Sequence, residues 1–302
     1  MADKTPRVGI FMPAYNQGQY IDEAIESLKA QTFQDFEVAV VDDASTDSVT
    51  IPILKKLHYD KATVYLNKSN QGVGNRARTY FEKLTNEYIL VLCADDKLQP
   101  KFIEECVAYL DKHPDYGAVG TWIQEFGESS DVREIKQRDA TFPKMLIENH
   151  FLGSSMMRRE ALVQIGFGNK AKVFQKHNDY DRWVSILEND WKLGVIEKPL
   201  FYYRILSTSL SRSINVAEEV AFRKAFIDKH KGLFEQHVQY LILHYYEASL
   251  VNWQWQKELA EGRDWLDIEY NKLKAEKENS KTLKAYSFVR TFLRPPRGFK
   301  KR

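Results

Sequence analysis

The hydrophobic pattern of the first 120 residues alternates between short apolar runs and longer stretches in which apolar residues recur every three or four positions. Short apolar runs are typical of buried strands, and the recurring pattern is typical of amphipathic helices. We expect strands at residues 8–12, 36–41, 62–66, 88–94 and 116–120. We expect helices at residues 20–31, 51–57, 76–84 and 100–113, the last with Pro100 at a first helical position. This alternation implies right-handed crossovers, so the sequence predicts an α/β fold with a mostly parallel sheet covered on both faces.

The pattern changes in the second half of the chain. Between residues 124 and 150 the periodicity fades, which predicts a flexible or substrate-covering loop. Residues 151–166 return to a strand–turn–helix pattern, residues 178–189 are amphipathic, and residues 193–204 predict two short strands around Pro199. Beyond residue 215 the chain is helical in character, and no internal repeat is visible.

Polar segments follow four of the predicted secondary-structure elements at one edge of the predicted sheet. They are PAYNQG (13–18), DDASTD (42–47), NQGVGNR (70–76) and ADD (94–96). Ligands of open α/β sheets bind outside the carboxyl ends of the strands. Asp95 and Asp96 repel each other unless water, a cation or a hydrogen-bond donor compensates them. A solvated turn explains such a pair in isolation, but four polar loops at one edge favour a binding site.

Composition narrows the class of protein. The chain has 302 residues, of which 43% are hydrophobic and 13% aromatic, enough for a substantial core. Its two cysteines, Cys93 and Cys106, are expected to be buried and reduced rather than paired, which favours a cytoplasmic location. We see neither a signal-peptide layout nor an apolar run of about 18 residues, so a membrane span is not expected.

Charge is distributed unevenly along the chain. Residues 283–302 contain seven basic and no acidic residues, and the rest of the chain has 37 basic against 42 acidic residues. An acidic body with a basic tail argues against general nucleic-acid binding. The tail also contains Leu, Tyr and Phe, so it could contact an anionic membrane surface peripherally. A solubilising tail or a helix that docks on a partner subunit are the alternatives.

Several common motifs are absent. The loop after the first strand is PAYNQG rather than G-x-G-x-x-G, and the chain has no G-x-x-x-x-G-K-[ST] loop. A G-x-S-x-G hydrolase elbow and a zinc-type Cys/His spacing are also missing. These absences argue against a Rossmann dinucleotide-binding protein, a P-loop NTPase, a hydrolase with a nucleophile elbow and a zinc protein.

A family resemblance emerges from several motifs in order. FMPAYNQGQYIDEAIESLKAQTFQDFEVAVVDDASTD resembles the opening of the family 2 glycosyltransferases, inverting enzymes with the GT-A (nucleotide-diphospho-sugar transferase) fold. NQGVG, YILVLCADD and NDYDRW…YYR follow in the family's order, so the resemblance covers about residues 7–212. It implies a catalytic GT-A domain over residues 1–212, a helical extension over 213–282 and the basic tail over 283–302.

The resemblance assigns the acidic pair to the donor and to a cation. ADD is similar to the family's D-x-D-type motif, so Asp96 is expected to contact a divalent metal and Asp95 the ribose hydroxyls or a metal-bound water. Mn²⁺ or Mg²⁺ suits carboxylates and phosphate oxygens. Such a cation acts as a Lewis acid toward the departing diphosphate.

The resemblance also implies a pocket for the nucleotide base. Asp43 is expected to accept the N3–H of a uracil, which favours UDP although dTDP shares that edge. The base pocket is expected to be lined by Pro13, Ala14, Tyr15 and Asn16. Either Arg76 or Arg78 would approach the base or the diphosphate, and the spacing does not choose between them. The neighbouring polar residues have a turn or helix-cap role as their alternative to a place in this pocket: Asp42, Ser45 and Asp47.

The catalytic base is expected in NDYDRW, which is similar to the family's EDYDLW. Inversion requires an acceptor hydroxyl to lose its proton as it attacks, and the resemblance assigns this role to Asp179. A helix N-cap is the alternative for this residue. Asp181 lies two positions further on and is expected to point elsewhere, as a cap or in a pair with an arginine.

Two departures from the family pattern stand out. Asn178 replaces the family's Glu, which removes a charge near the base, and Leu206 in YRILSTS replaces a His that many relatives have. The metal would then be held more loosely, or His150 or His177 would compensate.

We therefore expect an enzyme that transfers a sugar from a nucleotide donor to a saccharide or lipid-linked acceptor in bacterial surface polysaccharide assembly. The alternatives are a catalytically silent sugar-nucleotide-binding module and a nucleotidyltransferase. The Trp- and Tyr-rich stretch 236–273 is a candidate homodimer interface.

Overall fold

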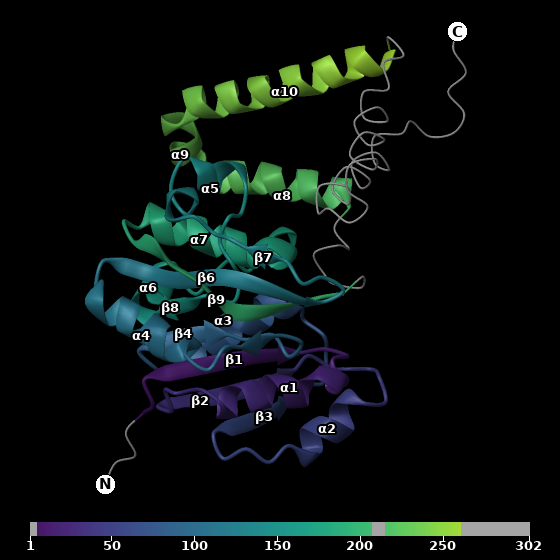
Figure 1. The fold of residues 1–302 in the computed structure, drawn as a ribbon, viewed down its shortest axis with the longest axis vertical. Coiled ribbons are helices and arrows are strands. Elements are labelled where there is room, and N and C mark those ends of the chain that lie inside the picture. The colour runs from purple at the N-terminus through teal and green to yellow at the C-terminus, as the bar shows by residue number, and fades with distance from the viewer. Residues whose placement is uncertain (1–4, 207–214, 261–302) are drawn as a thin grey trace, which may run out of the picture. The chain divides into compact units, whose positions relative to one another are not determined.

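The computed structural model describes residues 5–206 and 215–260. The chain forms two compact units, residues 1–237 and 238–302 (Figure 1). The domain boundary expected at residue 212 falls within the first unit, and the one at residue 282 lies outside the described residues, as does the basic tail. The division into three parts therefore stays a prediction.

The N-terminal half of the first unit is a parallel sheet in the order β3-β2-β1-β4. Its strands are β1 (Val8–Ala14), β2 (Phe36–Asp42), β3 (Ala62–Leu66) and β4 (Tyr88–Val91). The connecting helices are α1 (Gly18–Lys29), α2 (Thr50–Lys56) and α3 (Val73–Lys83). Each of these elements overlaps the one expected from the hydrophobic pattern. Parallel pairing brings the polar ends of β1, β2 and β4 to one edge.

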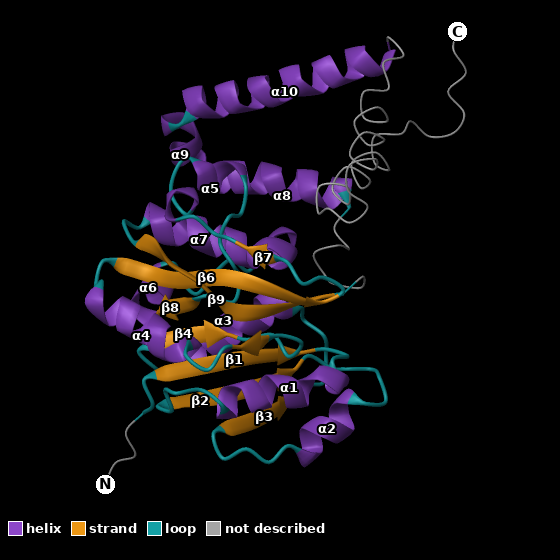
Figure 2. Cartoon of the chain, viewed as in Figure 1, coloured by secondary structure: helices purple, strands orange, loops and turns teal. Residues whose placement is uncertain are grey.

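The second half of the sheet is mixed. It continues from β4 through β8 (Met156–Arg158), β6 (Tyr116–Gly127), β9 (Lys192–Ile205) and β5 (Lys97–Leu98). Strand β8 is antiparallel to both β4 and β6, whereas β6 and β9 are parallel. Figure 2 shows these strands in the middle of the unit with helices around them. The helices are α4 (Phe102–Lys112), α6 (Arg159–Gln164) and α7 (Asn178–Glu188), the last preceded by a 3-10 turn at Lys172–His177.

Three expectations about this half are corrected. Residues 193–204 form the single strand β9, because β9 stays paired with β6 across Pro199 by means of register shifts. The segment 124–150 is not one long loop, since β6 runs on to Gly127 and pairs with β7 (Val132–Arg133). The segment also contains a 3-10 turn (Gln137–Asp139) and α5 (Lys144–Ile147). Pro100 precedes α4 by two residues instead of starting it.

Two further helices of the first unit, α8 (Val216–Lys229) and α9 (Lys231–Gln236), follow the sheet. Helix α8 begins with a capping box in which the Asn215 side chain accepts from the N–H of Glu218. The buried rings of Phe222 and Phe226 lie against Tyr180 of α7. Helix α8 thereby fixes the helix that carries the expected catalytic base.

The second unit contains α10 (Val238–Ala260), which is described here by itself. No described helix is long and apolar enough to cross a membrane.

Candidate active site

The loops that follow β1 and β2 are tied together by hydrogen bonds. The N–H of Asn16 donates to Ser45 Oγ at 2.9 Å, and Asn16 Oδ1 accepts from the N–H groups of Thr46 and Asp47 at 2.8 and 3.0 Å. Asn16 has a φ of 55°, a left-handed conformation that Asn adopts more readily than most residues. The loop PAYNQG is therefore fixed in one conformation by its neighbour.

Asp47 has the helix-cap role that the sequence analysis named for it. Its Oδ1 accepts from the N–H groups of Val49 and Thr50, and its Oδ2 accepts from the Thr50 hydroxyl at the start of α2. Asp42 likewise accepts from the N–H of Ser45 within its own turn. Both carboxylates serve to shape the loop beside Asp43.

A cavity of about 420 Å³ lies at this edge of the sheet. All seven side chains predicted to bind the donor line it: Pro13, Ala14, Tyr15, Asn16, Asp43, Arg76 and Asp95. The predicted metal ligand Asp96 also lines it, together with Gln17, Tyr20, Tyr203 and Leu206. Tyr15 is 43% exposed, so its ring offers a surface on which a flat group can pack.

Asp43 and Arg76 form a buried ion pair at the side of this cavity. Arg76 Nε lies 2.5 Å from Asp43 Oδ1, and both side chains are more than nine-tenths buried. Asp43 also accepts from the N–H groups of Gln71 and Gly72, and the Arg76 guanidinium donates to the Ser69 carbonyl. Arg78 lies on the outer face of α3, where it pairs with Glu82. Of the two arginines between which the sequence did not choose, Arg76 lines the cavity and Arg78 does not.

The adjacent carboxylates Asp95 and Asp96 both line the 420 Å³ cavity. Asp96 is 2% exposed and accepts from the backbone N–H of Arg204 at 2.9 Å, and Arg204 Nε donates to the Asp95 carbonyl oxygen at 2.9 Å. Burial, followed by the charge of Asp95, raises the pKa of Asp96 well above its usual value. Burial also raises the pKa of Asp95. The partly buried Asp95 and the buried Asp96 lie side by side, and such a pair of carboxylates favours a cation.

Cys93 is the third member of this group. One ligand atom from each of Cys93, Asp95 and Asp96 falls within 4.8 Å of the others. Burial, followed by the charges of Asp96 and Asp95, raises the pKa of the Cys93 thiol well above its usual value, so the thiol stays protonated. The oxygens of Asp95 and Asp96 are therefore the ligands that fit a hard divalent cation here.

Neither histidine named as a compensating ligand joins this group in the described residues. His177 stacks on Phe222, with ring centroids 4.0 Å apart, and its Nε2 lies 3.2 Å from Glu219. His150 lines the second cavity described below. Leu206 lines the 420 Å³ cavity, so an apolar side chain occupies the position where many relatives have His.

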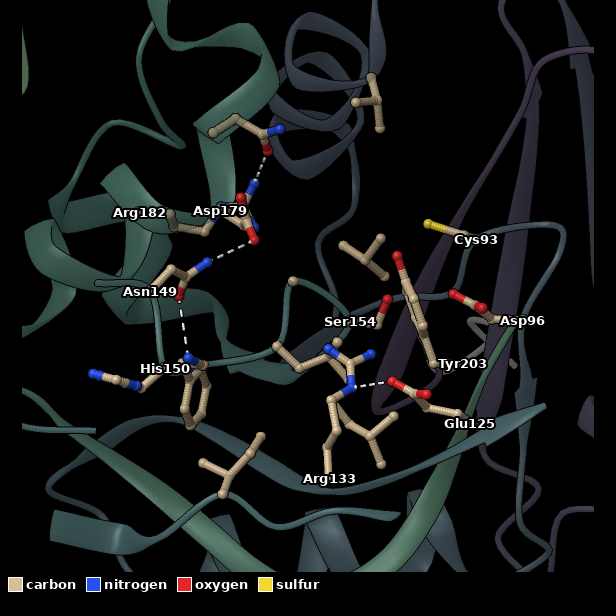
Figure 3. Close-up of a pocket in the computed structure, with 18 of the residues that line it drawn as sticks. Cys93, Asp96, Glu125, Arg133, Asn149, His150, Ser154, Asp179, Arg182 and Tyr203 are labelled. Carbon is tan, nitrogen blue, oxygen red and sulfur yellow. Dashed lines mark hydrogen bonds and ion pairs between the residues drawn. The ribbon is translucent and has the colours of Figure 1, made fainter. Parts of the chain in front are cut away.

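A second cavity of about 760 Å³ adjoins the first (Figure 3). Four residues line both cavities: Val73, Cys93, Asp96 and Tyr203. In Figure 3, Cys93 and Asp96 lie on one side of this cavity and Asp179, Arg182 and Asn149 on the other. Asp96 therefore lies at the junction of the two cavities, with Asp179 across the larger one.

Asp179 lies in the first turn of α7 and faces this larger cavity. Its Oδ2 accepts from Asn149 Nδ2 at 3.1 Å, which leaves Oδ1 available (Figure 3). The backbone of Gly153 passes so close that a Cβ at this position would lie 3.1 Å from Asp179 Oδ2. Asp181 points elsewhere as expected, but its partners are Lys229 at 2.7 Å and His230 at 3.2 Å rather than an arginine.

The sequence analysis missed several residues of the larger cavity. Asn149 holds Asp179, Tyr203 lies at the junction, and Arg133 pairs with Glu125 at 2.8 Å beneath it (Figure 3). Glu125 and Arg133 come from the β6–β7 pair within the segment that was expected to be a loop. The position of Asn149 carried no motif that could have identified it.

Comparisons with known proteins show the family and the fold of the chain. The family model described as "Glycosyl transferase family 2" matches residues 9–169. An uncharacterised glycosyltransferase of Methanocaldococcus jannaschii is 28% identical over 209 residues, which cover 66% of this chain and 71% of the relative.

Two solved structures have the same fold. Residues 1–349 of S. aureus TarS in complex with UDP-GlcNAc align with a TM-score of 0.58 and 20% identity, covering 70% of this chain and 62% of that chain. The mannosyltransferase PcManGT of Pyrobaculum calidifontis, in complex with GDP-Man and Mn²⁺, aligns with a TM-score of 0.53 and 20% identity, covering 68% and 59%. The chain thus spans about three fifths of these structures, and the expected GT-A fold is confirmed.

Proposed function

Because this chain belongs to glycosyl transferase family 2, we propose that it transfers a sugar, with inversion, from a UDP-sugar to a saccharide or lipid-linked acceptor. One observation carries the proposal. The cavity lined by the seven predicted donor residues meets the cavity that holds Asp179, and the two join at Asp96. A donor and an acceptor bound in these chambers would present the reacting groups to each other at the junction.

The smaller cavity would hold the nucleotide. A carboxylate has about four lone-pair sites, and Asp43 uses some of them to accept from Arg76, Gln71 and Gly72. Asp43 would accept the N3–H of uracil with a remaining site. Arg76 would orient this carboxylate through its ion pair. The exposed ring of Tyr15 would pack against the base.

Asp95 and Asp96 would hold a divalent cation, Mn²⁺ or Mg²⁺, since their carboxylate oxygens lie within 4.8 Å of each other and burial raises the pKa of both groups. When bound, this cation would supply positive charge against the departing diphosphate. Arg204 would fix the pair through its bonds to Asp96 and to the Asp95 carbonyl. The Mn²⁺ in the complex of the archaeal mannosyltransferase supports the choice of a divalent ion.

The larger cavity would hold the acceptor, and its volume of about 760 Å³ suits a saccharide. Asp179 would take the proton of the acceptor hydroxyl as that oxygen attacks the anomeric carbon from the face opposite the diphosphate. Asn149 would keep the Asp179 carboxylate turned toward the cavity. By analogy with the family, the product would belong to a bacterial surface polysaccharide, assembled at the inner face of the membrane. The basic tail would contact anionic lipid there, and residues 236–273 would form a homodimer interface.

A donor screen tests this proposal. Thermal unfolding of the full chain would be followed with UDP-, dTDP- and GDP-sugars, each with and without Mn²⁺. We expect UDP-sugars to give the largest shift, and Mn²⁺ to increase it in the natural protein but not in Asp96→Asn. The exposed Asp115, which pairs with Lys192, provides the control Asp115→Asn, which should behave as the natural protein does. A larger shift with GDP-sugars would reject the role given to Asp43, and no shift with any donor would reject the proposed function.

A further inference from the structure

One cation in the wall of the larger cavity makes no ion pair with any described residue. Arg182, in the second turn of α7, is 3% exposed and lines this cavity three residues after Asp179 (Figure 3). Within the described part of the chain, no carboxylate lies within ion-pair distance of its guanidinium, although Asp179 and Asp181 act on it at longer range. An arginine at this depth normally has a partner, because a buried charge without one is strongly destabilising.

The hydrogen bonds of Arg182 are also incomplete. One N–H of its Nη2 donates to Asn178 Oδ1 at 2.7 Å, and Nη1 makes a weak 4.0 Å contact with Met157 Sδ. Its Nε is buried with no hydrogen-bond partner among the described residues. A guanidinium has five N–H donors, so most of the fork is left for another group.

The other cations of this cavity differ in this respect. Arg133 is paired with Glu125 at 2.8 Å, and Lys176 is paired with Glu218 at 2.8 Å. The guanidinium of Arg182 is instead partly compensated by rings, since it lies 4.9 Å from the centroid of Phe81 and 5.5 Å from that of Trp183. Burial lowers the pKa of Arg182 to about 10, so the group is still charged at neutral pH.

The sequence departs from the family motif at the two residues that touch here. The motif EDYDLW has an acid at the position of Asn178 and a leucine at the position of Arg182. In this chain the acid is gone, a cation is gained, and the amide of Asn178 holds the new guanidinium. The two changes together make this wall more positive by two charges.

We propose that Arg182, held by Asn178, binds an anionic group on the acceptor, either a carboxylate of an acidic sugar or a phosphate. The planar fork of arginine matches both groups and can bind them through two parallel hydrogen bonds. Asp179 presents the opposite charge in the same wall, so an acceptor would turn its hydroxyl toward Asp179 and its anion toward Arg182. This inference rests on the proposed function, because it gives the larger cavity to an acceptor.

Binding of matched probe pairs tests the inference. The full chain, with UDP present, would be titrated by calorimetry with methyl β-D-glucuronide against methyl β-D-glucoside, and with glycerol 3-phosphate against glycerol. We expect the anion of one pair to bind at least about tenfold more tightly than its neutral partner. The pair that shows the preference distinguishes a carboxylate from a phosphate.

Variants assign the preference to Arg182. Arg182→Gln should reduce it to within about threefold, Arg182→Lys should keep most of it, and the double variant Asn178→Glu/Arg182→Leu should abolish it. Arg138→Gln, which removes a 73% exposed arginine outside the cavity, should leave it unchanged. Circular dichroism would establish that each variant is folded.

Three outcomes would overturn the inference: equal binding of both members of each pair, no binding of either anion up to about 10 mM, or a preference that survives in Arg182→Gln. UDP binding is measured separately on every variant and should not change. Failure of the natural protein to bind UDP would reject the proposed function, and it would leave the anion preference as an independent result.

Discussion

Replacing Arg76 by methionine should damage both the fold and the donor cavity. Arg76 is the buried partner of Asp43, at 2.5 Å, and it also donates to the Ser69 carbonyl. Methionine keeps the apolar stem of the side chain and removes the charge. The substitution therefore leaves a buried carboxylate without its cation, which is the costly way to break an ion pair.

The magnitude follows from what Asp43 keeps. Removing one partner of a buried pair costs about 3–5 kcal/mol. Asp43 retains the N–H groups of Gln71 and Gly72, so we expect the lower end of this range, and the lost hydrogen bond to Ser69 adds about 1 kcal/mol. Arg78→Met is the matched control two residues away. It removes a surface pair with Glu82, which is worth less than about 0.5 kcal/mol.

Urea unfolding followed by tryptophan fluorescence would measure these costs, together with UDP binding. In a double-mutant cycle, Arg76→Met combined with Asp43→Asn should cost about 1–3 kcal/mol less than the sum of the single changes. Both single variants should weaken UDP binding, whereas Arg78→Met should not. Additive costs, or equal costs for Arg76→Met and Arg78→Met, would refute the reasoning.

Three further predictions concern the larger cavity and its surroundings. Asp179→Asn should lower kcat for sugar transfer by roughly 10²–10⁴-fold and leave UDP affinity unchanged, and substantial turnover would contradict its assignment as base. Gly153→Ala places a Cβ 3.1 Å from Asp179 Oδ2, so kcat should fall about tenfold or more, whereas Gly232→Ala, where nothing lies within 4 Å, should keep full activity. Burial lowers the pKa of His177 below 6.5, so the unfolded chain binds a proton first and stability should decrease as the pH falls from about 6.5 through the lowered pKa. His177→Phe, which can still stack on Phe222, should flatten this dependence in urea midpoints measured between about pH 5 and 7, and an unchanged slope would exclude this residue as its source.

Local patterns predicted the first half of the fold well. The strand at residues 62–66 was placed at its observed bounds, and β2 was placed to within one residue. These elements form between neighbouring segments of the chain, so their hydrophobic period is visible in short windows. Strands β6 and β9 were read as shorter pieces because their distal halves carry polar residues and Pro199, and they are held by each other across about 75 residues of chain.

The residues of the candidate site also fall into a group that local sequence could predict and a group that it could not. That the predicted donor residues would lie together could be inferred because they follow parallel strands, whose carboxyl ends must meet at one edge. The choice of Arg76 over Arg78 could not be made, since two residues on a helix point in nearly opposite directions and the sequence does not say which faces the sheet. Asn149 and Arg182 reach the larger cavity from distant segments, so only the folded chain brings them together.

The division of the lining along the chain has a consequence for protein engineering. Apart from Tyr203 and Leu206, the residues around the smaller cavity all precede residue 97, whereas most of those around the larger one follow residue 122. On the proposed function, a chimaera joined in the turn between α4 and β6, with the second part from another family member, should change its acceptor and retain its nucleotide. In such a chimaera, strand β9 would come from the second protein and contact the acidic pair of the first. Its residue 204 donates a backbone N–H to Asp96, which most residues can supply, whereas the bond to the Asp95 carbonyl oxygen comes from the arginine side chain, so a second part that carries an arginine at this position would keep both bonds.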